Sequence, residues 1–548
     1  MKKNRAMIVV VIASLCVVGF SAVDSVYMKI GQNIDVFGRV YKEIVSNYVD
    51  EVDPEKFMRS GIDGMLETLD PYTVYMAGKE EDDIDLLTHG QYGGVGISIG
   101  VRDGAIIVLA PTEGYSAFKQ GVKTGDKIIE VDGIMITGTN PDSVRFKVRG
   151  EPGTTVRMKV EREGEKNPIE FTLVREEIQV HNVGYSGFVR EGVGYIRLER
   201  FSRRAGEEIR QAIKELKAKG EVKGIILDLR DNPGGLLEAA VETVSKFAKK
   251  GSTIVSTRGR RDDETKKYTV DEEPVAADIP MAVLVNKNSA SASEIVAGAI
   301  QDLDRGIIVG TRSFGKGLVQ TVIPLNYNAS MKITTARYYT PSGRCIQEID
   351  YLHRSKEGVF AVTPDSLKRE FKTSNGRNVK ELGGISPDST VEDIQRSSYY
   401  GELMRKALFF KFATTYVVNH PTFEGDFVAT PAVMREFEQY LNAQKFEFVE
   451  PAEKKLTELK EQMKKEKYSS TSLSSVDALI SQIHSEKVNT FARYSDEIRN
   501  ELTEEINSRY NGEKGRDRAM LKYDTQAQIA ASLVLNKKYY EGVLKGKK

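Results

Sequence analysis

The sequence is poor in the residues that build disulfides and metal centres. Only two cysteines, Cys16 and Cys345, and five histidines occur in 548 residues, and tryptophan is absent. Because Cys16 lies in an apolar N-terminal run, we expect no disulfide within the mature chain. The motifs H-E-x-x-H and C-x-x-C do not occur, and the histidines lie in unrelated contexts. We therefore expect neither a metal ion nor another cofactor.

A net charge is also missing, because 79 basic residues balance 79 acidic ones. This balance gives no indication of a nucleic-acid partner. The apolar content of 40% and the charged content of 29% are typical of a soluble globular protein. A chain of 548 residues is too long for one ordinary core, so we expect two to four domains.

The N-terminus differs from the rest of the chain. Lys2, Lys3 and Arg5 precede the apolar run "MIVVVIASLCVVGFSAV". A basic flank followed by about 17 apolar residues indicates an export segment, at the lower length limit for spanning a bilayer. The basic flank and the terminal position argue against a buried core helix. We predict that residues 1–30 are a signal peptide or an uncleaved anchor in the inner membrane, and that the rest is exported.

Two different patterns of apolar residues follow one another between residues 36 and 177. Apolar residues at three- and four-residue spacing predict helix from about residue 36 to 76, ending at the proline turn of "LDPYTVYM". Short alternating apolar runs cut by glycine follow, from about 86 to 177, with a short helix near 116–120. They predict a compact β-rich module.

Strands and helices alternate after residue 180. Apolar strands such as "GIILDLR" and "MAVLVN" are each followed by a helical segment. This alternation predicts an α/β fold with a largely parallel sheet. Beyond residue 397 the chain is charged and helical, with a polar linker at 467–475. The predicted parts are an N-terminal helical region at 31–85, an inserted β-rich domain at 86–178, an α/β core built from βαβ units at 179–395 and a C-terminal helical extension at 396–548.

The segment "GTRSFGKG", residues 310–317, has three interpretations. A phosphate-binding loop is disfavoured because Gly317 replaces the magnesium-binding Ser or Thr and "LVQTVIPL" predicts a strand where a helix is needed. An S-x-x-K acyl-enzyme pair of Ser313 and Lys316 needs a helical turn, yet Gly315 and Gly317 are poor helix residues. Its partner motifs S-D-N and K-T-G are absent. The third interpretation is that Lys316 serves a nucleophile elsewhere.

A candidate nucleophile lies in "NSASASEIVAGAI", where a buried strand ends and a helix follows. Ser291 is expected near the helix N-terminus, where free N–H groups and the positive end of the helix dipole suit acyl transfer. The N–H of Ala292 can stabilise an oxyanion. The alternative is that Ser289, Ser291 or Ser293 only caps the helix, with Glu294 in its first turn.

The paired glycines of "LDLRDNPGGLL" indicate the other half of such a site. Glycines at a turn between strand and helix let backbone N–H groups approach a ligand closely, although the turn can also simply need positive φ. Ligands of open α/β sheets bind at the carboxyl ends of the strands. Gly234 or Gly235 is therefore predicted to complete an oxyanion hole with Ala292.

Lys316 is the candidate general base for Ser291. A lysine with a pKa near 10.4 is protonated at neutral pH, so the amine must be buried, at a cost of roughly 4 kcal/mol. Gln320 can orient the amine. In a regular strand, four residues place the two side chains about 13 Å apart, so they cooperate only if Gly315 and Gly317 bend the chain.

These segments resemble the sequence blocks of the carboxy-terminal processing peptidases, which are tail-specific serine proteases with a Ser/Lys dyad. The resemblance covers about residues 35–390. It rests on "NKNSASASEIVAGAIQD", "GTRSFGKGLVQ", "LDLRDNPGGLLEAAV", "TTARYYTPSGRCIQ", "GGISPD" and "LDPYTVYM". The roles that it implies are Ser291 as nucleophile, Lys316 as general base, Gln320 as the orienting partner, and Gly234 or Gly235 with the Ala292 N–H as the oxyanion hole.

The β-rich module resembles a PDZ domain. "GGVGISI", residues 93–99, fits the carboxylate-binding loop, in which the N–H groups of Val95, Gly96 and Ile97 hold a peptide C-terminus. The resemblance implies these peptide-binding residues: Gly94, Val95, Gly96, Ile97 and Arg149. In the family, this domain is implied to capture substrate tails and to gate the dyad. Arg149 aligns with an arginine implicated in that gating.

The predicted function is that of an exported serine endopeptidase that binds protein C-terminal tails through its PDZ domain and cleaves through an acyl-enzyme. The alternative is a PDZ-bearing scaffold or adaptor, which the loss of Ser291, Lys316 or Gln320 would favour; all three are present. The predicted partners are substrates with free C-termini, the membrane if the N-terminal segment is retained, and a second copy in a homodimer. The predicted location is extracytoplasmic, in the bacterial periplasm or cell envelope.

Overall fold

The computed structural model describes most of the chain as two compact units. The described residues are 26–77, 90–327, 329–354, 360–393, 395–486 and 489–546. The first unit holds residues up to 78 together with 320–334 and 351–354, and the second unit holds the rest. Most of the predicted export segment lies outside the described residues. Among those that are described, no helix combines the length and the apolar character needed to cross a membrane.

The N-terminal part of the first unit forms two helices and a strand. One helix covers residues 26–47, and α2 (Pro54–Leu66) begins after Asp53, whose carboxylate accepts the N–H groups at the start of the helix. β1 (Val74–Ala77) pairs antiparallel with the start of β18 (Ala329–Tyr339). The helical prediction is wrong at its end, since residues 74–76 are a strand. Their β-branched and aromatic side chains favour that conformation.

The predicted PDZ region folds into an antiparallel sheet in the order β3-β4-β5-β7-β8 with two short helices. Its core is made by Val108, Val131, Val144 and Met158. The helix α5 was not predicted from the sequence. The elements are β2 (Gln91–Gly94), β3 (Ile97–Arg102), β4 (Ala105–Pro111), α4 (Ser116–Lys119), β5 (Lys127–Val131), β6 (Ile134–Met135), α5 (Asp142–Val148), β7 (Thr155–Glu161), β8 (Ile169–Val174) and β9 (Glu176–Gln179).

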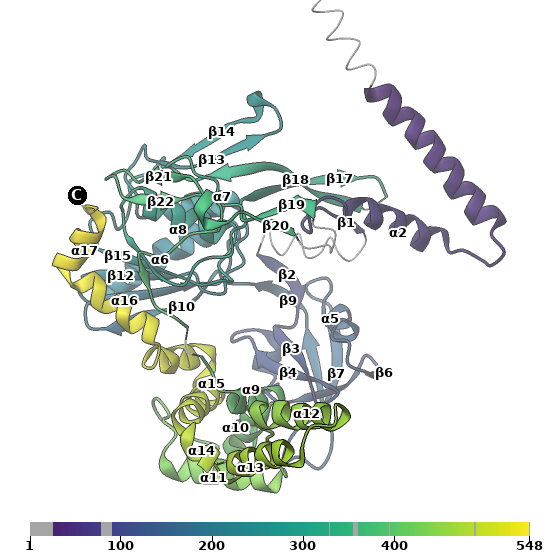
Figure 1. Cartoon of the computed structure of the whole chain (residues 1–548), viewed down its shortest axis with the longest axis vertical. Coiled ribbons are helices and arrows are strands. Elements are labelled where there is room, and N and C mark those ends of the chain that lie inside the picture. The colour runs from purple at the N-terminus through teal and green to yellow at the C-terminus, as the bar shows by residue number, and fades with distance from the viewer. Residues whose placement is uncertain are drawn as a thin grey trace, which may run out of the picture. The chain divides into compact units, whose positions relative to one another are not determined.

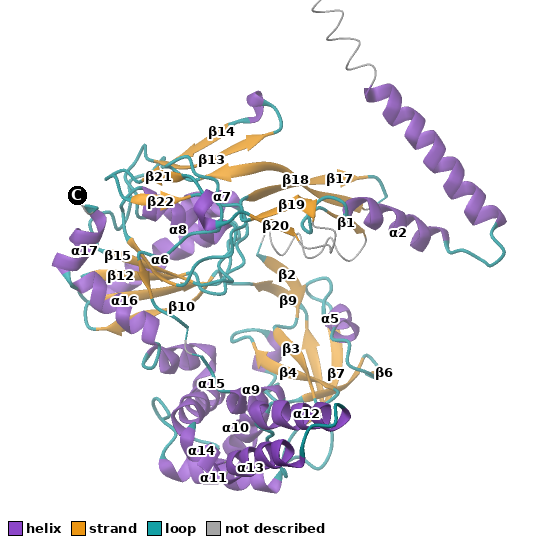
Figure 2. Cartoon of the chain, in the orientation of Figure 1, coloured by secondary structure: helices purple, strands orange, loops and turns teal. Residues whose placement is uncertain are grey.

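The α/β core is built on a six-stranded sheet, and its strand pairings confirm the prediction of a largely parallel sheet. Figure 2 shows the strands in orange and the helices in purple. Among the described strands of this sheet, only the edge strand β10 runs antiparallel to its neighbour, β11. The register pairs Leu227 with Val283 and Val283 with Ile308, so the carboxyl ends of three strands meet at one edge. The strands in spatial order are β10 (Val183–Arg190), β11 (Val193–Leu198), β12 (Gly224–Asp228), β15 (Met281–Val285), β16 (Ile307–Gly310) and β23 (Ser389–Thr390).

Helices cover both faces of this sheet because alternate residues of its buried strands point to opposite sides. Ile225 and Leu227 pack toward α6 (Ala205–Lys219), α7 (Leu237–Ser245) and α8 (Ala292–Asp302). Ile226 and Leu284 pack toward α16 (Thr525–Leu535) and α17 (Lys537–Leu544), drawn in yellow in Figure 1. The last helices of the predicted C-terminal region therefore complete the hydrophobic core of the α/β domain.

Smaller β-elements surround the core. β13 (Thr253–Gly259) pairs antiparallel with β14 (Lys266–Thr269) and with the end of β18, an arrangement that the sequence did not predict. "LVQTVIPL" forms the predicted strand, β17 (Leu318–Leu325). The remaining elements are the 3-10 helices η2 (Asp262–Glu264) and η3 (Asp365–Leu367) and the strands β19 (Ile349–Arg354), β20 (Phe360–Val362), β21 (Glu370–Lys372) and β22 (Asn378–Lys380).

The rest of the C-terminal region is a helical domain with its own aromatic core. In this core, Phe409 stacks on Phe437, and Phe412 meets Phe437 edge to face. The predicted polar linker at 467–475 is wrong from Ser470 onward, where α13 begins. The helices are α9 (Ser398–Arg405), α10 (Leu408–Asn419), α11 (Pro431–Ala443), α12 (Pro451–Lys465), α13 (Ser470–Glu486), α14 (Thr490–Arg493) and α15 (Ser495–Leu521), the last one kinked at Gly512.

Candidate active site

Ser291 occupies the tight connection between β15 and α8. Its backbone has φ 56° and ψ −114°, a sparsely populated conformation for a non-glycine residue. Ser289 and Ser293 are fully buried, and their hydroxyls donate to the carbonyls of Leu229 (2.7 Å) and Asn232 (2.9 Å). Ser291 is partly exposed. The flanking serines therefore hold the loop in place, and Ser291, which stands at the N-cap position of α8, is the one that solvent and ligands reach.

The turn at 229–235 is bound to the Ser291 loop through Asn232. The Asn232 carbonyl accepts the N–H of Ala290 at 3.1 Å in addition to the Ser293 hydroxyl. The Asn232 amide donates to the carbonyl of Leu198 at 2.7 Å. Asn232 is completely buried. These hydrogen bonds connect the turn that follows β12 to the loop that follows β15.

Gly234 lies directly against Ser291. A Cβ atom on Gly234 would come within 2.9 Å of both the Ser291 Cβ and the Ala292 nitrogen, and φ is 103°, so only glycine fits. The Gly234 N–H donates to the Asn232 side chain at 2.9 Å. In the described part of the chain, the N–H groups of Gly235 and Ala292 have no acceptor. Gly235 and Ala292 thus carry N–H groups that can donate to the oxygen of a ligand, and their role as oxyanion donors stays a prediction.

Glu294 connects the Ser291 loop to the Lys316 loop. This fully buried carboxylate accepts four hydrogen bonds, from the Ser313 hydroxyl (2.6 Å) and from the N–H groups of Gly315 (2.6 Å), Lys316 (2.8 Å) and Ser291 (2.9 Å). Burial raises the pKa of Glu294 to about 7, and the four hydrogen bonds act in the opposite direction. The sequence placed Glu294 only in the first helical turn, and its link to the Lys316 loop was missed.

Tyr338 makes a second connection between the same two loops. Its hydroxyl lies 3.1 Å from the Ser291 carbonyl oxygen and 2.5 Å from the Lys316 carbonyl oxygen. The ring is buried in the core, and burial raises the pKa of the phenol. Two contacts from separate elements thus bring the backbones of Ser291 and Lys316 together. Tyr338 was not recognised in the sequence.

The segment 311–317 is irregular and contains no helix. Ser313 is buried, and its hydroxyl accepts the Ile385 N–H at 2.6 Å while it donates to Glu294. Gly315 and Gly317 allow close packing against Gln347, the side chain of Glu348 and the backbone of Gly384. A strand follows at Leu318. These features exclude both the phosphate-binding loop and the helical S-x-x-K pair.

Gln320 belongs to the first unit, whereas Ser291 and Lys316 belong to the second. Within its own unit, the Gln320 amide donates to the Thr334 hydroxyl at 3.2 Å. The Thr334 N–H in turn donates to the Thr73 hydroxyl at 3.2 Å. The orienting role of Gln320 stays a prediction.

The predicted carboxylate-binding loop is a short turn before an edge strand. The Val95 and Gly96 carbonyls accept the N–H groups of Ala117 (3.0 Å) and Thr112 (2.8 Å). Their own N–H groups have no acceptor among the residues that the structure describes. Ile97 begins β3, which lies at the edge of its sheet and can accept an added strand. The loop thus has the features needed to bind a peptide carboxylate.

Arg149 lies close to this loop through an aromatic contact. Its guanidinium stacks over the ring of Tyr92, 4.7 Å from the ring centre. That ring is packed against Gly94. Gly93 and Gly150 also approach each other, with a 3.2 Å hydrogen bond from the Gly150 N–H to the Gly93 carbonyl. A contact of Arg149 with peptide stays a prediction.

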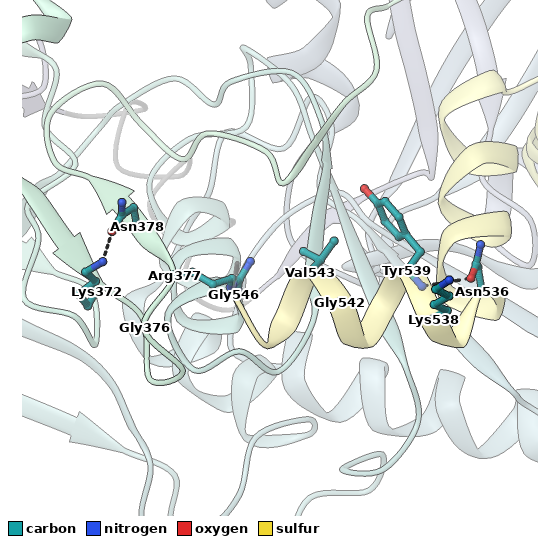
Figure 3. A pocket seen from close by; sticks show the side chains of 10 residues that line it. All are labelled: Lys372, Gly376, Arg377, Asn378, Asn536, Lys538, Tyr539, Gly542, Val543 and Gly546. Atoms are coloured by element: carbon teal, nitrogen blue, oxygen red, sulfur yellow. Dashed lines mark hydrogen bonds between the residues drawn. The ribbon is translucent and has the colours of Figure 1, made fainter. Parts of the chain in front are cut away.

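A cavity of about 770 Å³ lies elsewhere, between the β21–β22 hairpin and α17 (Figure 3). It is lined by Arg377, Lys538 and Tyr539, among others, and by none of the predicted site residues. Within the described residues, no group of three or more His, Cys, Asp or Glu side chains is arranged to hold a metal ion.

Family models match the chain in four segments. Peptidase family S41 matches residues 192–365 and the PDZ domain matches 93–173. The C-terminal helical domain of a probable PDZ-protease matches 400–534, and the N-terminal domain of the activating protease CtpB matches 21–80. The fold and the site therefore define a PDZ-containing peptidase of family S41.

Individual relatives narrow this class. A carboxy-terminal-processing protease of Bartonella bacilliformis is 39% identical over 340 residues, which are 62% of this chain and 78% of the relative. CtpB of Bacillus subtilis, a carboxy-terminal processing protease, is 34% identical over 386 residues, 68% of this chain and 79% of the relative. The chain belongs to the carboxy-terminal processing protease family. The solved photosystem II D1 C-terminal processing protease is 27% identical, with a TM-score of 0.35, covering 65% of this chain and 92% of the other.

Proposed function

We propose that this protein is an exported serine endopeptidase in which Ser291 attacks the peptide bond and Lys316 acts as the general base. The observation that carries this proposal is the close approach of Gly234 to Ser291, beside the unpaired N–H groups of Gly235 and Ala292. An oxyanion formed at Ser291 would lie between those two donors, which contribute most when they are already in position.

The proposed reaction passes through an acyl-enzyme. The neutral Lys316 amine takes the proton of the Ser291 hydroxyl as its oxygen bonds to the substrate carbonyl carbon. The protonated amine then donates that proton to the leaving amine as the peptide bond breaks. Water hydrolyses the ester with Lys316 again as base, which regenerates Ser291. Gln320 is proposed to orient the Lys316 amine.

The PDZ domain is proposed to deliver substrates by their C-terminal tails. The unpaired N–H groups of Val95 and Gly96 support capture of a free carboxylate, and the open edge of β3 supports strand addition. The basic and apolar N-terminus supports export to the bacterial periplasm or cell envelope, with residues 1–30 either cleaved or kept as a membrane anchor. The homodimer stays a prediction from the sequence.

A fluorophosphonate probe and a peptide-cleavage assay test this function. We expect the wild-type protein to be labelled and to cleave, and Ser291→Ala to lose both while it keeps its thermal unfolding transition. A folded Ser291→Ala variant that still cleaves would place the nucleophile elsewhere. Tail binding without turnover in the wild type would support the adaptor instead.

A further inference from the structure

A buried ion-pair network joins the turn at 229–235 to helix α16. The Arg230 Nε donates to both carboxylate oxygens of Asp228, each at 3.0 Å. The other nitrogens of Arg230 reach α16, where they contact the Asp524 carboxylate at 3.1 and 2.5 Å and the Gln526 side-chain oxygen at 2.9 Å. Only 15% of the Arg230 side chain and 8% of the Asp524 side chain are exposed. Arg230 and Asp524 lie 294 positions apart in the sequence.

Each partner of Arg230 is itself fixed. Asp228 ends β12 and accepts the Tyr195 hydroxyl at 2.6 Å. Burial alone would raise the pKa of Asp228, but the Arg230 charge and hydrogen bonds hold it below its usual value. Asp524 is the N-cap of α16 and accepts the Ala527 N–H at 2.9 Å. Arg230 is therefore held between a central strand and a helix embedded in the same core.

Arg230 stands at the entrance of the turn that carries the oxyanion glycines. The next residue, Asp231, has φ 59° and donates its N–H to the Asn286 side chain at 3.1 Å. Gly234 and Gly235 follow within four residues. A change in the position of Arg230 would move the start of this turn, and small displacements of an oxyanion donor are costly because the donor must already point at the developing charge.

We propose that Asp524 and Gln526 are positioning residues for the oxyanion hole, acting through Arg230. The inference rests on the proposed function, and it makes cleavage at Ser291 depend on the contacts of Arg230 with the start of α16. Part of the C-terminal region, beyond the segment that the peptidase model matches, is thereby assigned to the catalytic apparatus.

The test compares two contacts made by the same helix. In Asp524→Ala, Arg230 loses the charged partner of the two that it contacts at the start of α16, and Gln526 remains. In the matched control Arg190→Ala, α16 loses docking bonds of Arg190 to the Gln528 side chain (2.7 Å) and the Ser532 hydroxyl (3.0 Å), which do not involve the turn. We expect kcat to fall about tenfold in Asp524→Ala with KM unchanged, since the loss of a whole oxyanion donor costs roughly 100-fold or more. Arg190→Ala is expected to keep the wild-type kcat when the assay temperature is well below the Tm of the variant.

A peptide boronate inhibitor gives an independent readout, because its tetrahedral adduct uses the oxyanion donors. Its affinity should fall in Asp524→Ala by the same factor as kcat. Asp524→Asn keeps the N-cap hydrogen bond and one acceptor for Arg230. It should fold and show an intermediate loss, and it decides the question if Asp524→Ala does not fold.

Three results would overturn the inference. They are equal kcat values for Asp524→Ala and Arg190→Ala, a loss confined to KM, and unchanged boronate affinity. If Asp524→Ala does not fold, a wild-type kcat in Asp524→Asn would also overturn it. Failure of the proposed function would be seen differently, as turnover that persists in Ser291→Ala in the same assay.

Discussion

The carboxylate of Glu294 accepts the backbone N–H of Lys316 at 2.8 Å, although the two residues lie 22 positions apart. The same carboxylate accepts the N–H of Ser291. One buried acid therefore fixes the backbones of the proposed nucleophile and the proposed base. Because it is the third residue of α8, its position is set by the helix that begins at Ser291.

Glu294→Gln should impair both folding and turnover. Four donors surround the carboxylate, and glutamine offers them one oxygen and an NH₂ group that cannot accept. Each buried donor left without a partner costs about 1–3 kcal/mol. We expect a Tm several degrees lower and kcat/KM reduced at least about tenfold, since roughly 1.4 kcal/mol corresponds to a factor of ten. The exposed Glu215→Gln on α6 is the control. Wild-type kcat/KM and Tm in Glu294→Gln would contradict the linking role.

Ser313→Ala and Lys316→Ala should separate structure from chemistry. Ser313→Ala removes two buried hydrogen bonds, to Glu294 and to the Ile385 N–H. It should lower the free energy of unfolding by about 1–3 kcal/mol and leave the folded enzyme active. Lys316→Ala should lose turnover as completely as Ser291→Ala. The measurement is kcat/KM of each variant at a temperature well below its Tm. A Ser313→Ala enzyme that is folded but as inactive as Lys316→Ala would restore the S-x-x-K interpretation.

Glu294 should also make stability depend on pH. Its pKa is about 7 in the folded protein against 4.5 normally, so the folded state holds the proton more tightly than the unfolded chain. The free energy of unfolding should fall as the pH rises from about 4.5 to about 7, by at most about 3 kcal/mol. Urea unfolding at pH 5 and pH 8 measures this. Because other acids titrate too, the comparison is with Glu294→Gln, which should lack this part of the slope. If the free energy of unfolding of the wild type and of Glu294→Gln changed with pH in the same way, the prediction would be refuted.

The sequence predicted the α/β core well because its signals are local. Apolar strands such as "MAVLVN" and the following helix can be recognised in one stretch, and the convergence of strand ends then places Ser291 near the glycine turn. The contact of Gly234 with Ser291 bears out that argument. Glycines were recognisable because few other residues tolerate their backbone conformation.

The remaining features depend on contacts between distant segments. Tyr338 lies 47 residues from Ser291, and nothing in its local sequence indicates which carbonyls its hydroxyl meets. The apolar residues of α16 can be read from the sequence, but the surface that they cover is decided by tertiary packing. The end of the N-terminal helical region was also misjudged, since pairing with β18 turned residues 74–77 into a strand.

Turnover should depend on a free carboxylate at the end of the substrate. Hydrogen bonds from the N–H groups of Val95, Gly96 and Ile97 to a charged carboxylate are worth roughly 1.5–3 kcal/mol each. Amidation of the peptide removes the charge, and a loss of about 2 kcal/mol would lower capture roughly thirtyfold. We therefore expect kcat/KM for a free-acid peptide to exceed that for its amidated twin by about that factor.

Two glycine variants of the PDZ domain make this prediction specific. Gly96 and Gly104 both have positive φ, at 75° and 72°, but only a Cβ on Gly96 would clash, 2.6 Å from the Tyr115 Cβ. Gly104 has open space around it. Gly96→Ala should therefore distort the carboxylate loop and remove the difference between the two peptides, whereas Gly104→Ala should keep it. Equal rates for both peptides on the wild-type enzyme would leave a Ser/Lys endopeptidase that does not recognise tails, because the loop would then contribute nothing to capture.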